Sequence, residues 1–176
     1  MDHIQINCHI DENIFKNFSN FNNFTFHKRW ISLTLFPFIM IFFALVNKMT
    51  HSDLFFWIFL ILGFFLPLTY LFIFKASIQK QIQYFHLETP KIAYSLTMTE
   101  SGVAIENIKE KTQYSWSQIY LVARSTNAHY LYITKDKAFI LPHTDIQDGI
   151  TPDQLWSFFQ NHVETLHTKD YRKQNT

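Results

Sequence analysis

Two long apolar runs interrupt an otherwise mixed sequence. They cover residues 30–46 and 54–74, contain no ionisable side chain, and are separated by the polar segment 47–53. As helices they would reach about 25 and 31 Å, at ~1.5 Å per residue, against a hydrocarbon core of roughly 30 Å. The pattern therefore predicts a two-helix transmembrane hairpin over residues 30–74, with the lipid bilayer as its partner.

The alternative is a pair of helices buried in a water-soluble core. Both helices would then be apolar on every face, and a chain of 176 residues has too little other protein to cover them. Pro37, Gly63 and Pro67 also agree with the membrane interpretation, because spanning helices tolerate such residues where neighbours satisfy the freed backbone groups.

The basic residues predict the orientation of the hairpin. Lys28 and Arg29 precede the first run, Lys75 and Lys80 follow the second, and the connecting loop carries Lys48. By the positive-inside rule, we expect both termini in the cytoplasm and the loop outside. A cleaved signal peptide is not expected, since a long segment precedes the first run.

Residues 1–29 are predicted to form a strand and a short helix. Alternating apolar residues indicate the strand, Asp11 can cap the helix, and phenylalanines then recur every three residues: Ile4, Ile6, Cys8, Ile10, Phe15, Phe18, Phe21 and Phe24. The helix either rests in the lipid headgroups or is a connecting helix whose rings pack on the neighbouring domain; we favour the second.

Residues 75–90 are predicted to continue the second span as a helical stalk. Ile78, Ile82 and Phe85 share one helical face, and Pro90 ends the pattern. The stalk either transmits motion between lipid and domain or is a passive spacer, and the sequence leaves both interpretations open.

From residue 92 the apolar period changes to two, which is typical of antiparallel strands joined in hairpins. Thr151 is then predicted to cap a helix whose first residue is Pro152, with Gln154 as the capping-box partner. Its apolar face is predicted to contain Trp156, Phe159, Val163 and Leu166.

Residues 91–168 are therefore predicted to form a small cytoplasmic α+β domain, with the helix covering an open side of an antiparallel sheet or partial barrel. The charged segment 169–176 is predicted to be a flexible tail.

Charge and composition narrow the classes of function. The formal net charge is +1 and the basic residues are scattered, which argues against nucleic acid as a partner. The single cysteine, Cys8, excludes an intramolecular disulfide. Three glycines in the whole chain build no known phosphate-cradling loop.

The nine histidines prompt a search for metal or acid–base sites. His162 and His167 lie five positions apart, about 140° around a helix, and cannot share one ion. His129 and His143 have no cysteine or carboxylate at ligand spacing. We therefore expect no catalytic residues, no metal and no cofactor, and predict that the chain is not an enzyme.

Three residues are candidates for an interaction site. Trp116 is predicted to project from a strand or its end, and Leu141 and Pro142 stand where an apolar strand enters a turn. An open edge strand in this domain would also accept a partner peptide.

The order of these parts resembles the YcxB-like family of bacterial membrane proteins. The motifs that carry the resemblance are SWSQIYLV, AFILP and the final helix near TPDQLWSFF. It implies two spans and a C-terminal domain similar to a pleckstrin-homology (PH) fold, with Ile4 to Ile10 supplying a further strand. It also implies the bacterial inner (cytoplasmic) membrane. Where that family commonly has a basic residue after the proline, this chain has His143, which does not favour an anion site there.

Three functions follow as hypotheses. The leading one is a non-enzymatic scaffolding module of the inner membrane whose domain binds another protein or its own copy as a homo-oligomer. The alternative is an immunity or envelope-stress protein that acts against a membrane-active toxin. The third is a membrane-associated hydrolase that uses His129 or His143.

Overall fold

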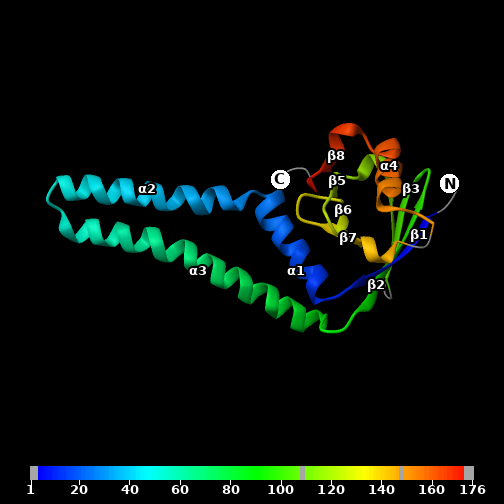
Figure 1. Cartoon of the computed structure of the whole chain (residues 1–176), viewed down its shortest axis with the longest axis horizontal. Coiled ribbons are helices and arrows are strands. Elements are labelled where there is room, and N and C mark those ends of the chain that lie inside the picture. The colour runs from blue at the N-terminus through cyan, green and yellow to red at the C-terminus, as the bar shows by residue number, and fades with distance from the viewer. Residues whose placement is uncertain (1–3, 108–109, 147–148, 173–176) are drawn as a thin grey trace. The chain divides into compact units, whose positions relative to one another are not determined.

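The computed structural model describes residues 4–107, 110–146 and 149–172. The chain divides into two compact units, residues 15–88 and a strand-rich unit made of residues 1–14 with 89–176 (Figure 1). In the described residues the structure is α+β, with two long apolar helices and two sheets.

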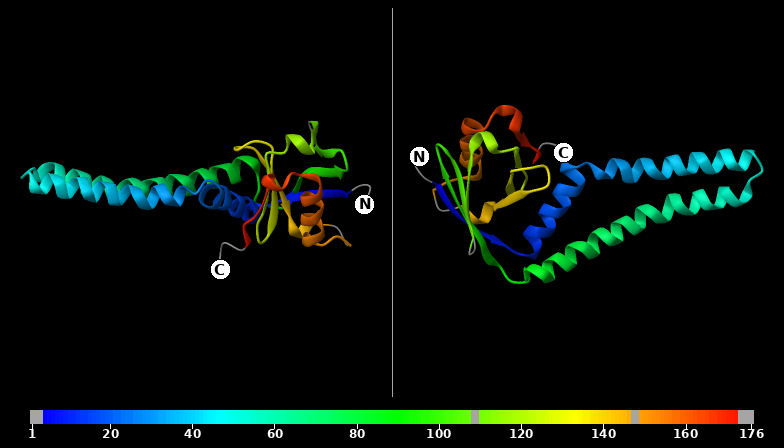
Figure 2. Two further views of the ribbon diagram at one scale, coloured as in Figure 1. Left: turned by 90° about the horizontal axis from the view of Figure 1, so that it is seen from above. Right: turned by 180° about the vertical axis from the view of Figure 1, so that it is seen from behind.

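Residues 15–88 form a helical hairpin. Helix α1 (Glu12–Asn20) leads into a π-helical segment at Phe21–Phe26, and the hairpin itself consists of α2 (Arg29–Met49) and α3 (Asp53–Phe85), which run side by side (Figure 2). As predicted, Asp11 caps α1, since its carboxylate accepts a hydrogen bond from the Ile14 amide at 2.7 Å.

Helix α3 is longer than the second apolar run. It continues without a break through the predicted stalk and ends at Phe85, where His86 adopts a left-handed conformation (φ 52°). The amides of His86 and Leu87 then close the last turn on the carbonyls of Gln83 and Ile82. The second run and most of the stalk are therefore one helix.

The two helices expose most of their apolar surface. Each is long and apolar enough to cross a membrane, and 6% of its most apolar window is buried. They touch closely at Gly63, where an added Cβ would lie 2.9 Å from Met40 Cβ. A small residue is therefore required at this crossing.

The first sheet pairs a strand that precedes the hairpin with three strands that follow it. Its order is β1 (Ile4–Ile10), β2 (Lys91–Thr99), β3 (Gly102–Glu106) and β4 (Lys111–Ser115), with every neighbouring pair antiparallel. The alternation in the first ten residues predicted β1, and the structure confirms it: Ile4, Ile6, Cys8 and Ile10 are buried.

The second sheet has the order β7 (Ala138–Pro142), β6 (Ala128–Tyr132), β5 (Leu121–Arg124) and β8 (Thr168–Asp170). Strand β8 is parallel to β5 and the other pairs are antiparallel. The described strands form two open sheets and no closed barrel. The predicted boundary between domain and tail lies between residues 168 and 169 and therefore falls inside β8. The sequence pattern missed this strand because three residues are too few to show an apolar period.

Helix α4 (Pro152–His162) completes the core. Leu155, Trp156 and Phe159 pack with the inward-facing residues of both sheets. The helix is shorter than predicted: it ends at His162, and Leu166 is 84% exposed rather than part of the apolar face. Val163 is buried, but its backbone is extended.

Candidate functional site: a groove on α4 and the buried cluster beneath it

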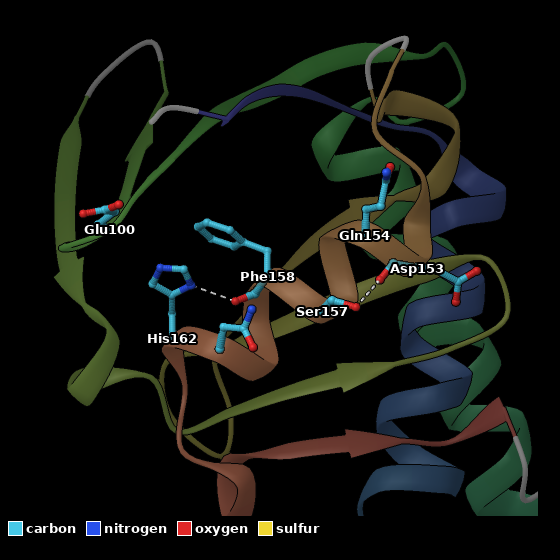
Figure 3. A pocket seen from close by; sticks show the side chains of 7 residues that line it. Glu100, Asp153, Gln154, Ser157, Phe158 and His162 are labelled. Carbon is cyan, nitrogen blue, oxygen red and sulfur yellow. Dashed lines mark hydrogen bonds between the residues drawn. The ribbon is translucent and has the colours of Figure 1, made fainter. Parts of the chain in front are cut away.

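A groove of about 480 Å³ runs along the exposed face of α4 (Figure 3). Glu100, from the turn between β2 and β3, lies on one side, opposite Phe158 and His162 of α4. The remaining lining residues come from the same helix: Asp153, Gln154, Ser157 and Asn161.

The start of α4 is fixed by its capping box. The Thr151 hydroxyl accepts from the Gln154 amide at 3.2 Å, and the Gln154 side chain accepts from the Thr151 amide at 2.8 Å. Asp153 and Ser157 are four residues apart and therefore follow one face of the helix. Thus the local sequence that begins the helix also places the polar wall of the groove.

The far end of the groove is aromatic. The rings of Phe158 and His162 lie 4.2 Å apart, and His162 Nδ1 lies 2.8 Å from the Phe158 carbonyl. A carbonyl oxygen only accepts, so Nδ1 carries the proton and Nε2 of the neutral ring is an acceptor. Among the described residues, Glu100 has no hydrogen-bond or ion-pair partner, which leaves its carboxylate available to a ligand.

Asp153 connects the groove to a buried cationic side chain. Its carboxylate, 77% exposed, pairs through Oδ1 with Arg124, which is only 3% exposed. The hydrogen bond from Arg124 holds the pKa of Asp153 below its usual value, and the positive charges of Arg124 and Arg172 act in the same direction. The Arg124 guanidinium also lies 5.8 Å from the Trp156 ring centroid.

A histidine pair lies deeper in the same cluster. His143 Nε2 is 3.2 Å from His129 Nδ1, and His129 is fully buried, with its ring stacked on Trp156 at 5.9 Å. Burial first, and then the charges of His143, Arg124 and Arg172, lower the pKa of His129 to about 3, although Asp170 opposes the shift. His129 is therefore a neutral core residue at physiological pH.

The histidine pair lacks further metal ligands. Within residues 4–107, 110–146 and 149–172, no group of three histidine, cysteine, aspartate or glutamate side chains is arranged to hold a metal ion. The buried cluster of Arg124, His129 and His143 instead contributes ion-pair and packing contacts to α4.

The structure buries all three predicted interaction residues. Trp116 donates from Nε1 to the Thr99 carbonyl at 3.0 Å and packs edge-on against Phe158, so it backs the aromatic end of the groove. Leu141 and Pro142 belong to β7, where Leu141 is opposite His129. Their role in binding stays a prediction.

The sequence search missed the residues that build this site. No sequence pattern points to Asp153 or Glu100, and none indicates that His129 and His143 lie against each other. The available signal was Arg124, a charged residue that ends an apolar strand and therefore needs a partner when buried.

The fold and site define an α+β protein with an apolar helical hairpin and a strand-rich unit that carries a polar groove. Residues 99–155 match the family model described as YcxB-like protein, which confirms the family indicated by the sequence motifs. The match extends from the end of β2 into α4 and includes Arg124, His129, His143 and Asp153. No curated protein and no solved structure matched the chain.

Proposed function

We propose that this chain is a two-span protein of the bacterial inner membrane whose strand-rich unit binds a polypeptide partner in the groove along α4. The exposure of α2 and α3 is the observation that carries the membrane part. Large apolar side chains such as Phe38, Phe42 and Phe72 are exposed along both helices. Water would not tolerate so large a continuous apolar surface on a monomer, whereas hydrocarbon favours it.

The pairing of β1 with β2 supports an even number of crossings. Strand β1 precedes both helices and β2 follows them, yet the two are joined by an antiparallel ladder from Ile4–Met98 to Ile10–Lys91, with one shift of register between Cys8 and His9. Residues 4–10 and 91–99 must then lie on one side of the membrane. The positive-inside bias makes that side the cytoplasm.

We also propose that the strand-rich unit is PH-like. Two four-stranded sheets around one shared core, with a single helix against that core, support this comparison. The β1 strand, supplied from before the hairpin, is the addition that the resemblance implied.

Membrane fractionation tests the first part of the proposal. The full chain should remain in the membrane pellet after alkaline carbonate and enter solution with detergent. A folded monomer in the detergent-free supernatant would overturn it. Reporter fusions at both ends should both report the cytoplasm.

The chemistry of the groove selects the partner. Glu100 offers a free carboxylate, Asp153 Oδ2 has no partner among the described residues, and Phe158 offers an apolar surface. A segment that carries a lysine or arginine beside an apolar side chain complements this set. The partner is a different protein or a second copy of the chain.

Site-specific crosslinking tests the groove. A photoreactive residue at Asn161 should yield one reproducible crosslinked protein from membranes, and the product should be lost with Glu100→Lys. Glu110→Lys is the matched control, because it makes the same charge change outside the groove. Equal crosslinking in both charge variants would contradict the proposed site.

The alternative function, immunity against a membrane-active toxin, has no support from the contacts or the family match and is therefore not proposed.

A further inference from the structure

A second groove, of about 380 Å³, lies between α2 and α3. Arg29, Ser32 and Tyr70 line it with polar atoms, and the other lining residues are apolar: Leu33, Phe36, Leu66 and Pro67. On α2 these positions follow one helical face at steps of three or four residues.

The groove is polar at one end and apolar at the other. Arg29 begins α2 and lies beside Tyr70, since Arg29 Nη1 donates to the Tyr70 hydroxyl at 3.1 Å. Phe36 is about 10 Å further along the helix, at ~1.5 Å per residue. Beyond Phe36 the helices close on each other at Gly63 and Met40, which ends the groove on its apolar side.

The polar end retains unused donors. The Tyr70 hydroxyl donates to Asn23 Oδ1 at 3.0 Å, and Asn23 is 7% exposed, with Nδ2 unpaired among the described residues. Among the described residues, Arg29 makes no ion pair with a carboxylate. A guanidinium presents five N–H donors, so most of those on Arg29 remain for an anion.

We propose that this groove binds one anionic phospholipid, with its phosphate on Arg29 and an acyl chain along Leu33, Phe36 and Leu66. The inference rests on the proposed membrane function. A phosphate is the anion that matches an arginine at the polar edge of a hydrocarbon layer, and basic sites between spanning helices recognise such headgroups. The apolar wall of the groove complements the acyl chain of a phospholipid. Free phosphate has no such chain and would leave this wall without a partner.

The test measures lipid retained by the full chain. The protein is reconstituted in nanodiscs of equal parts phosphatidylglycerol and phosphatidylcholine, released, and analysed by native mass spectrometry. Wild type should retain phosphatidylglycerol preferentially. Arg29→Gln should lower the retained fraction about tenfold, the loss expected for one charge-assisted hydrogen-bonded contact.

Two further variants separate the groove from general surface charge. Ser32→Phe keeps the cation but fills the groove, and it should also abolish retention. Lys75→Gln removes one positive charge just beyond the second apolar run, outside the groove, and should retain the lipid as wild type does. Equal loss in Lys75→Gln, or unchanged retention in Arg29→Gln, would overturn the proposal.

Inorganic phosphate distinguishes the source of the anion. Excess phosphate should not displace the lipid; displacement would mean that the site recognises a free anion and would also overturn the proposal. Flotation with pure phosphatidylcholine vesicles separates this inference from the proposed function. A chain that floats but retains no phosphatidylglycerol refutes only the lipid site, whereas a chain that does not float refutes the membrane proposal itself.

Discussion

Lowering the pH should destabilise the strand-rich unit through His129. The unfolded chain takes up a proton at this histidine as the pH falls through its ordinary pKa of 6.5, whereas in the folded chain the pKa is about 3. Proton uptake between these values therefore favours the unfolded state, and stability is lost as the pH falls.

The magnitude follows from the pKa shift. Each pH unit inside this window costs about 1.4 kcal/mol, so moving from pH 6.5 to 5 should lower the free energy of unfolding by about 2 kcal/mol. His143, whose pKa is lowered by burial first, adds to the loss. Asp153 and Asp170 have pKa values held below 3.8, mainly by hydrogen bonds from Arg124 and Arg172, and they stay ionised across this range.

The assay is urea unfolding of the full chain in detergent at pH 5, 6 and 7. Fluorescence would report on Trp116 and Trp156 after Trp30 and Trp57, in the helical hairpin, are changed to phenylalanine. His129→Leu should make the dependence on pH shallower.

The control is His51→Asn, which removes an imidazole from the exposed turn between α2 and α3 and should leave the slope unchanged. The reasoning is refuted if stability is flat or rises toward pH 5, or if His129→Leu keeps the wild-type slope.

Three further substitutions test the packing and the helix end. Gly102→Ala should destabilise the chain by about 2–3 kcal/mol in urea unfolding, because the new Cβ would collide with the Tyr114 carbonyl across the β3–β4 pair; an unchanged midpoint would show that the hairpin can shift. Phe159→Ala should cost about 3–5 kcal/mol in the same assay, since this ring is fully buried on the inward face of α4, and a loss below 1 kcal/mol would contradict that packing. His86→Gly should slow hydrogen exchange in the last turn of α3, with a gain of about 0.5–1 kcal/mol, because glycine adopts the left-handed backbone without a Cβ penalty; faster exchange would argue against that cap.

Local sequence signals correctly predicted the first strand and the start of the last helix. The alternation from Ile4 to Ile10 gave β1, and Thr151 with Gln154 gave the start of α4. The predicted end of α4 was wrong because no glycine or proline directly after His162 marks the end of the helix. The backbone becomes extended at Val163. Helix starts carry specific side-chain signals, whereas this helix end carries none.

The candidate site could not be predicted in the same way. Arg124 meets His129 through the register of β5 and β6, and Asp153 reaches Arg124 only after α4 docks. These proximities depend on strand pairing and helix packing, which no spacing along the chain encodes. The lipid groove likewise needs Arg29 and Tyr70 to meet across two helices.

The β1–β2 ladder also orders the biosynthesis of this protein. Residues 4–10 leave the ribosome before their partners at 91–99, which emerge only after both apolar helices have been made. The first strand must therefore wait, unpaired, until the whole hairpin has been made; under the proposed two-span topology, this is also the period in which the hairpin enters the bilayer. If the two apolar helices stay in water, they are exposed together with an unmatched strand edge, and both promote aggregation and proteolysis. Closure of the first sheet is thus a late step that follows synthesis of the hairpin.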